Sequence, residues 1–520
     1  MRKKDMQYFI CVDIGTTTIR VCVYCEQKCK LIFSKAEKVE LLCPKRDRAE
    51  IDPEKLWDQF VGLIKSAVEI LPKSCRDTEH VTMGICCQRN SFITWNKETL
   101  EMCHPIITWK DSRAKDVCAT WNSSISVKGL NIVGWLVYFI TRSQRFKAAK
   151  IFKFLDAMVS HRFMVTLDEN KTMRQLLDQG MLGFGCLDTW LINRLTNGRI
   201  IVTEPSNASS TGLFDPFLGN WGTSILRLIG FPIDVLPELV NTAQVIAVTE
   251  PEIFGFPIRI GACLGDSQAA AFGCGCVREN FVKISLGTGT FVNFNCGENV
   301  FASMKGMYPL VGWKINDNTT FFVEGRCNNT AASIQFAQVM GLIDNVDTAS
   351  DIAFGTPPEP GLCFISAFNG VQTPVDNDNA CSAFIGFHPN TSKAQMLRAV
   401  LESIAFRVYQ IWQGMKEGIP MGSTPLIRLC GGVSQNDFIC QQIAHLMCVK
   451  VDRVCDSQFT GARGAALLCG ITKGVWTIDT IEELIQIDST FYPDKEMSDE
   501  LVKRYDLWIR AQGRCLNFYN

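Results

Sequence analysis

The sequence lacks any block of charge of a single sign. Its 52 lysines and arginines are balanced by 53 aspartates and glutamates, which gives a formal net charge of −1. No predicted helix gathers Lys or Arg into the basic patch that nucleic-acid-binding proteins use. We therefore expect no nucleic-acid partner, and this absence favours chemistry on small molecules.

A hydrophobic run long enough to cross a membrane is also missing. The longest apolar stretch, residues 130–140, is interrupted by Asn131, whereas a bilayer span needs about 20 residues. The N-terminus is basic, but it has neither a sustained apolar core nor a small-residue cleavage site, so it does not fit a secretory signal. These absences predict a cytoplasmic protein without a membrane span.

The 24 cysteines lack the spacing of a disulfide framework. They are scattered through predicted strands and helices, as at Cys86, Cys87 and Cys263, rather than clustered as in a small secreted domain. Cys22 and Cys25 could form a metal-binding pair, but they lie in an apolar strand with no second pair at zinc spacing. We predict reduced thiols and assign no metal to them.

What the chain does contain is enough material for two large domains. Its 520 residues exceed what one hydrophobic core usually organises, and 47% hydrophobic against 20% charged residues is typical of a globular protein. Strand and helix patterns alternate: Asp52 and Pro53 begin a predicted helix, and residues 81–87 form a predicted buried strand. We divide the chain into domains 1–259 and 260–520, with a cleft between them.

One arrangement of strand, small-residue turn and strand occurs in each half. In residues 8–25 two apolar runs flank Gly15-Thr16-Thr17-Thr18, and in residues 281–294 two more flank Gly287-Thr288-Gly289. Glycine lets a phosphate approach the backbone, and N–H groups and hydroxyls then donate hydrogen bonds to its oxygens. Neither turn has Walker A or dinucleotide spacing, and each alone is explained more simply as an ordinary hairpin. The pair favours two similar α/β domains that grip one triphosphate.

Three charged side chains follow apolar strands, the place where α/β proteins usually bind ligands. Arg89 follows the strand at residues 81–87. Asp13 ends the first strand, where a buried carboxylate needs a partner such as water-bound Mg²⁺, although an Asx turn also explains it. Asp266 stands between a strand and a helix, so it is either a helix cap or the base that takes a proton from an alcohol. A hydroxyl kinase needs little more than these groups and aligned substrates.

Together these motifs resemble the carbohydrate kinases named for a Phe-Gly-Gly-Tyr signature, and among them the glycerol kinases, across nearly the whole chain. Chance does not produce so many similar stretches in one order. They are residues 13–20, 88–89, 107–109, 187–192, 206–209, 265–270, 287–291, 401–405 and 431–432.

The resemblance implies two actin-like, ribonuclease-H-type domains that close over ATP, Mg²⁺ and a small polyol such as glycerol. It implies phosphoryl transfer to a terminal hydroxyl, with Asp266 as general base and Asp13 near Mg²⁺ through water. The residues that it assigns to the polyol are Arg89, Trp109, Asp266, Gln268 and Phe291. Those that it assigns to the nucleotide are Thr16, Thr17, Thr18, Arg20, Thr288, Gln335, Gly432 and Asn436.

Three departures from the glycerol-kinase pattern concern the ligand pockets. Asn90 follows the pocket arginine where those enzymes have glutamate, Ala157 takes the place of a pocket tyrosine, and Ala331 replaces a glycine near the adenosine. An amide can still hydrogen-bond to a hydroxyl, but it carries no negative charge. Glycerol is the leading substrate in a diverged branch of the family.

The departures keep two alternatives open: a kinase of another small sugar or sugar alcohol, and a catalytically weak relative that binds nucleotide and acts through partners. The presence of Asp13, Asp266 and both turns argues against the weak relative. An actin- or chaperone-type ATPase is disfavoured, because only a short tail follows Trp476. The oligomeric state is left open, a homo-oligomer included.

Overall fold

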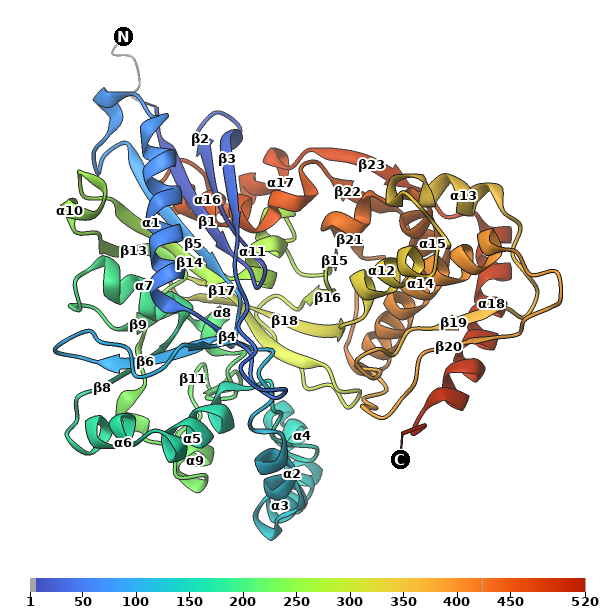
Figure 1. Ribbon diagram of the computed structural model, residues 1–520, viewed down its shortest axis with the longest axis horizontal. Helices are drawn as coiled ribbons and strands as arrows, with labels where there is room; N and C mark the ends of the chain where they lie inside the picture. The colour runs from blue at the N-terminus through green and yellow to red at the C-terminus, as the bar shows by residue number, and fades with distance from the viewer. Residues whose placement is uncertain (1–5, 423, 520) are drawn as a thin grey trace.

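The protein contains two large β-sheets, one in each half of the chain, in a computed structural model that describes residues 6–422 and 424–519. In Figure 1 most of the N-terminal half lies on the left and most of the C-terminal half on the right, and helices pack around both sheets. The helix α16 (Thr460–Thr472) is an exception, because it packs against the sheet of the N-terminal half. The two-part α/β architecture expected from the sequence is confirmed.

The first sheet has six strands in the order β13-β14-β5-β1-β2-β3. Their bounds are β1 (Tyr8–Ile14), β2 (Thr18–Cys25), β3 (Lys30–Lys38), β5 (Val81–Cys87), β13 (Ala243–Val248) and β14 (Arg259–Gly265). β1 pairs antiparallel with β2 and parallel with β5, and β14 pairs parallel with β5. The central strands β1 and β5 are covered on both faces, which explains their nearly unbroken apolar sequences.

The second sheet repeats this pairing scheme within seven strands, in the order β17-β18-β16-β15-β21-β22-β23. Their bounds are β15 (Phe281–Leu286), β16 (Thr290–Asn295), β17 (Tyr308–Ile315), β18 (Asn318–Cys327), β21 (Leu426–Cys430), β22 (Val451–Val454) and β23 (Ile487–Phe491). β15 pairs antiparallel with β16 and parallel with β21, and β21 pairs parallel with β22. Both predicted hairpins are confirmed, and each begins a sheet of the same order.

Helices complete a hydrophobic core on each sheet. The predicted helix α1 (Pro53–Glu69) packs its apolar stripe on the first sheet, and the Asp52 side chain caps it by accepting hydrogen bonds from the Glu54 and Lys55 N–H groups. The second core includes α14 (Lys393–Gly418), α15 (Asp437–Met447) and the terminal helix α18 (Lys495–Cys515). All 24 cysteines are free thiols, as predicted, and most of them are buried.

Two helices hold the halves together by direct backbone contact. α11 (Asp266–Gly273) follows β14 of the first sheet, and α16 (Thr460–Thr472) follows β22 of the second. A Cβ atom on Gly273 would lie 1.9 Å from the Thr460 carbonyl oxygen, and one on Gly464 would lie 1.9 Å from the Ala269 carbonyl oxygen. The chain passes from sheet to sheet between β14 and β15, and the division into 1–259 and 260–520 stays a prediction.

Substituting Gly464 with alanine is expected to destabilise the protein by about 1–3 kcal/mol, because the added methyl group must push α11 and α16 apart. The matched control is Gly62→Ala in α1, where a Cβ atom would meet nothing within 4 Å; this change should be neutral or stabilising, because alanine favours helix. Urea unfolding midpoints measure both. Equal midpoints for the two variants would contradict the close packing.

Three helices form a protrusion from the N-terminal half, below both sheets in Figure 1. They are α2 (Lys115–Ser123), α3 (Ile125–Thr141) and α4 (Gln144–Ala149), and we call them the helical protrusion. In the ranges 6–422 and 424–519, no single helix has the length and hydropathy of a membrane span, although α2 and α3 taken together across their 57° bend do.

Candidate active site

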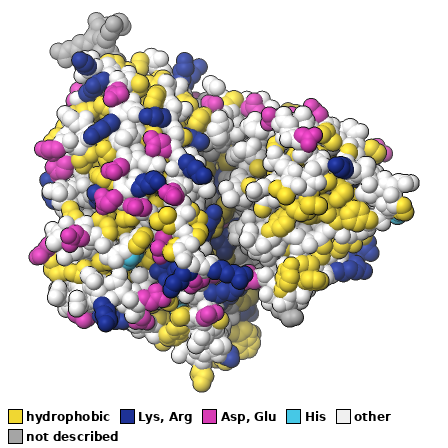
Figure 2. All heavy atoms as spheres, viewed as in Figure 1, with side chains coloured by type: hydrophobic (Ala, Val, Ile, Leu, Met, Phe, Trp, Pro, Cys, Tyr) yellow, Lys and Arg dark blue, Asp and Glu magenta, His cyan; other side chains and the backbone are white. Residues whose placement is uncertain are grey.

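A cavity of about 750 Å³ lies between the two halves, and Figure 2 shows the furrow that separates them. Both glycine turns and the ends of β5 and β14 contribute to its wall. The predicted residues on that wall are Asp13, Thr16, Thr17, Thr18, Arg20, Arg89, Trp109, Asp266, Thr288 and Phe291. The structure therefore places residues that lie up to half the chain apart around one space.

The first turn, between β1 and β2, is tied by hydrogen bonds to Gln88 and Trp109. The Gly15 N–H donates to the Thr18 carbonyl oxygen at 2.9 Å and closes the turn. The Thr16 hydroxyl donates to Gln88 at 3.0 Å and accepts a hydrogen bond from the Trp109 indole at 2.8 Å. Because the Thr16 hydroxyl holds Trp109 in place, the exposed Thr17 side chain and the turn's N–H groups are the better placed donors for phosphate.

The second turn, between β15 and β16, closes in the same manner. The Gly287 N–H donates to the Gly289 carbonyl oxygen at 3.0 Å, and the Thr288 side chain is exposed to the cavity. The Ala331 N–H, at the start of α12 (Thr330–Val339), donates to the Thr288 carbonyl oxygen at 3.1 Å and anchors the turn. Two matching turns therefore present backbone donors from opposite halves of the chain.

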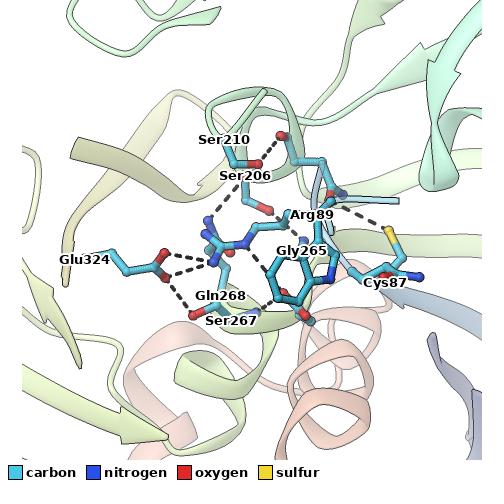
Figure 3. Close-up of polar contacts among 12 residues, drawn as sticks. Cys87, Arg89, Ser206, Ser210, Gly265, Ser267, Gln268 and Glu324 are labelled. Carbon is cyan, nitrogen blue, oxygen red and sulfur yellow. Dashed lines mark hydrogen bonds and ion pairs between the residues drawn. The ribbon is translucent and has the colours of Figure 1, made fainter. Parts of the chain in front are cut away.

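Arg89 is held between two carboxylates at the end of β5, and Figure 3 shows one of them, Glu324, facing the guanidinium. Its Nη2 donates to both Glu324 oxygens, at 2.8 and 3.1 Å, and its Nε lies 3.5 Å from an Asp266 oxygen. Gly265 makes room for this arrangement, because a Cβ atom there would lie 2.8 Å from the Arg89 side chain. The guanidinium is fixed in direction, and Asp266 keeps one side toward the cavity.

Glu324, on β18, is the centre of a buried polar network that sequence reasoning missed. Its Oε2 accepts hydrogen bonds from the Ser267 hydroxyl at 2.9 Å and from the Asn293 amide at 2.8 Å, and Lys283 donates to the same Ser267 hydroxyl at 3.0 Å. Burial alone would raise the pKa of Glu324, but the Arg89 guanidinium holds it below its usual value. Glu324 is therefore ionised and fixes the position of Arg89.

Asp266 and Asp13 are two carboxylates facing the same cavity. Desolvation by the surrounding protein raises the pKa of Asp266, and the positive charge of Arg89 partly opposes this rise. The Asp266 side chain is nevertheless 44% exposed, toward the cavity. Burial, and then the negative charge of Asp266, raises the pKa of Asp13 to about 6. A carboxylate with a raised pKa is a stronger proton acceptor, which suits Asp266 to general base chemistry.

The chemistry around Asp13 fits a hydrated Mg²⁺ ion. Asp266 disfavours a second negative charge at Asp13, and a divalent cation would relieve that repulsion. Within residues 6–422 and 424–519, no group of three or more His, Cys, Asp or Glu side chains forms a full metal cage. An ion here would take its remaining ligands from phosphate oxygens and water, as Mg²⁺ usually does.

The part of the wall around Trp109 and Asn90 is held in place by a buried arginine that the sequence did not single out. Arg162, on α5 (Val159–Glu169), donates to the carbonyl oxygens of Asn90 at 2.7 Å, of Ala157 at 2.8 Å and of Thr108. It ties together the three backbone segments that carry Asn90, Ala157 and Trp109. Asn90 adopts a φ of 63°, and its side-chain oxygen has no hydrogen-bond partner in the part of the chain that the structure describes.

Four predicted residues lie off the cavity wall. Gln268 is buried behind it, where its amide donates to the Ser206 and Val311 carbonyl oxygens. Gln335 is exposed on α12, and Asn436 caps α15 by accepting from the Ile439 N–H. Gly432 is exposed, whereas its neighbour Gly431 lines the cavity with a φ of 92°. The roles of these four residues stay predictions.

The chain matches the two domains of one known family. Residues 8–140 and 165–273 match the N-terminal domain of the FGGY family of carbohydrate kinases, and residues 282–472 match its C-terminal domain. The chain belongs to this family. Membership makes the protein an ATP-dependent carbohydrate kinase, and it excludes the actin- and chaperone-type alternative. Residues 141–164, which include α4, lie outside the match.

Relatives of this FGGY kinase span its whole length. It is 36% identical to the protein named glycerol kinase 5 from Homo sapiens, over 98% of this chain and 95% of that one. It is 30% identical to glycerol kinase 2 from Thermotoga maritima, over 99% of each chain. Both relatives carry glycerol kinase names, so the recognition made from the motifs is confirmed.

Solved structures confirm the fold. The Plasmodium falciparum glycerol kinase with ADP superposes with a TM-score of 0.87 at 24% identity, covering 98% of each chain. The gluconate kinase from Lactobacillus acidophilus gives 0.83 at 20% identity, covering 99% of each. These two proteins are named as different kinases yet share one fold, so the fold alone does not fix the acceptor.

Proposed function

We propose that this FGGY kinase transfers the γ-phosphoryl group of ATP to a terminal hydroxyl of glycerol, giving glycerol 3-phosphate and ADP. The observation that carries the proposal is the placement of Arg89 between Asp266 and Glu324, on the same wall as both phosphate turns. The glycerol kinase names of its relatives support glycerol as the acceptor. We expect the reaction to take place in the cytoplasm.

The proposed mechanism uses few groups. Arg89 donates to substrate hydroxyls and Trp109 and Phe291 cover the carbon chain, so one hydroxyl is directed at the phosphate. Asp266 accepts that hydroxyl's proton as its oxygen bonds to the γ-phosphorus and the bond from that phosphorus to the bridging oxygen of ADP breaks. The two turns and Arg20 hold the phosphates. Mg²⁺, held near Asp13 through water, supplies charge neutralisation when bound.

Asn90 favours acceptance of an uncharged polyol despite the missing glutamate. Asn90 lines the cavity, and its side-chain oxygen, which is buried without a partner among the described residues, would accept a hydrogen bond from a hydroxyl once the side chain turns toward the polyol. Ala157 leaves open space where a tyrosine would stand, and it lines the same cavity. A somewhat larger sugar alcohol is the second candidate acceptor, because this opening enlarges the pocket.

Glycerol is expected to stimulate ADP release more strongly than dihydroxyacetone, xylulose, ribulose or gluconate when each is added to purified protein with Mg-ATP. Asp266→Asn protein serves as the control for background ATP hydrolysis. A stronger response to another acceptor would move the substrate to that class. No response to any acceptor, with ATP still bound, would favour the catalytically weak relative.

A further inference from the structure

Helix α3 of the protrusion exposes a continuous apolar face. Ile132 is 60% exposed, Phe139 65% and Ile140 81%, and Leu136 and Trp135 are also exposed. Along the helix these five positions recur at steps of three or four residues. They therefore lie on one side of α3, the side that faces solvent. The end of the protrusion thus carries exposed hydrophobic side chains, and hydrophobic surface is visible at the bottom of Figure 2.

The opposite face of α3 is firmly packed. Val127 and Gly134 are its buried residues, and a Cβ atom on Gly134 would lie 2.7 Å from the Ala149 Cβ of α4. The Asn122 side chain exchanges two hydrogen bonds with the Phe154 backbone, at 2.8 and 2.9 Å, and fixes α2 to the end of the protrusion. The apolar face is therefore held outward by a folded support, and it does not result from a missing contact within the protrusion.

The charge of the helical protrusion is almost entirely positive, and Asp116 in the first turn of α2 is its only acidic residue. Between residues 117 and 155 the sequence contains no aspartate or glutamate and six basic residues: Lys128, Arg142, Arg145, Lys147, Lys150 and Lys153. Arg145 and Lys153 pair with carboxylates elsewhere in the chain, on Asp215 and Asp376. Arg142 and Lys150 lie over the Tyr138 ring, 5.6 and 4.7 Å from its centroid, so their charges stay close to the apolar face.

We propose that the helical protrusion docks this kinase on an anionic membrane surface, with the exposed face of α3 inserted at the interface and the basic residues among the lipid headgroups. α3 itself carries one charge, Lys128, and the other basic residues lie in α4 and in the segments that flank it. The protrusion as a unit therefore presents an apolar face with Trp and Phe bordered by Lys and Arg, a combination that binds membrane interfaces. At 17 residues, α3 is too short to span a bilayer. The basic residues beside this face match the negative charge of anionic lipid headgroups. A protein partner would present charges of both signs, and the face has no acidic side chains to pair with the positive ones.

This proposal is independent of the acceptor identity, since none of the exposed α3 side chains named here lines the cavity. The full-length protein is expected to float with vesicles of phosphatidylserine and phosphatidylcholine, and to float about tenfold less with phosphatidylcholine alone. Added salt should weaken the binding, because exposed charges are screened.

The decisive variant is the double substitution Ile132→Glu and Phe139→Glu. It should reduce vesicle binding about tenfold or more, because two carboxylates replace apolar groups at the interface. The matched control is Val339→Glu on α12, a side chain that is 77% exposed outside the protrusion, and it should bind like the wild type. Equal binding by the double variant and the wild type, or no binding by either, would overturn the proposal.

Trp135 provides a second measurement that does not depend on folding of a charged variant. Its fluorescence should shift to the blue when anionic vesicles are added, and Trp135→Phe should abolish the shift while still floating with vesicles. Sedimentation in the absence of lipid tests a different occupant: a concentration-dependent dimer that Ile132→Glu abolishes would assign the face to a second copy of the chain and overturn the membrane assignment.

Discussion

Asp266→Asn is expected to lower kcat by about 10²- to 10⁴-fold, the contribution typical of a positioned general base. Asparagine keeps the size and much of the hydrogen bonding of aspartate, so the cavity should keep its shape while losing its proton acceptor. Initial rates of ADP release measure kcat, and calorimetric titration with ATP should show nearly unchanged affinity. Near-normal turnover by the variant would rule out Asp266 as the base.

The acid side of the pH profile checks the same assignment. Asp266 must be ionised to accept a proton, so kcat/KM should fall as the pH falls through its pKa. Because the folded protein raises that pKa above 3.8, the fall should begin at a higher pH than an ordinary aspartate would give. The control is Asp215→Asn, a carboxylate on the same wall that is paired with Arg145. The control should keep the acid limb, and the residual activity of Asp266→Asn should lack it.

Arg89→Ala is expected to raise KM for the polyol far more than KM for ATP, because Arg89 is proposed to donate to substrate hydroxyls. The same change should destabilise the protein by about 3–5 kcal/mol, since it leaves the Glu324 carboxylate buried without its cation. The Glu324 side chain is only 4% exposed, so its charge is compensated mainly by the guanidinium and little by solvent. Steady-state kinetics and urea unfolding measure the two effects.

A second substitution separates binding from folding. The variant that combines Arg89→Ala with Glu324→Gln removes the unpaired charge, so it should recover much of the lost stability while the KM for the polyol stays high. If the double variant recovered both the stability and the normal KM for the polyol, Arg89 would affect substrate binding only by stabilising the folded protein. Equal rises in KM for polyol and ATP in the single variant would place Arg89 outside the acceptor pocket.

Much of the fold could be predicted because the strongest signals are local. The two hairpins, helix α1 with its Asp52 cap and the buried strand β5 follow from apolar periodicity and turn residues over short stretches. The direct backbone contact of Gly273 with α16 could not be found that way, because glycine at one position says nothing of which distant helix it meets. Long-range pairing, rather than element type, is what the local pattern leaves out.

For the site, the sequence located residues at strand ends but missed those within strands. Glu324 and Lys283 each interrupt an apolar strand, which is the same signal that singled out Asp13, yet neither stands at a turn where ligands are usually sought. Arg162 gave no signal, because its partners are backbone carbonyls of other segments. The roles of Gln268, Gln335, Gly432 and Asn436 rest on the family resemblance and still require mutagenesis.

The glycine contact between α11 and α16 fixes the distance between these two helices. Since bare backbones touch at Gly273 and Gly464, no side chain there can yield by changing rotamer. α16 also packs along β1, β5 and β14 of the first sheet, so the two halves are joined over the length of a helix. The gap between the two glycine turns is then set by this rigid packing rather than by the flexibility of either turn.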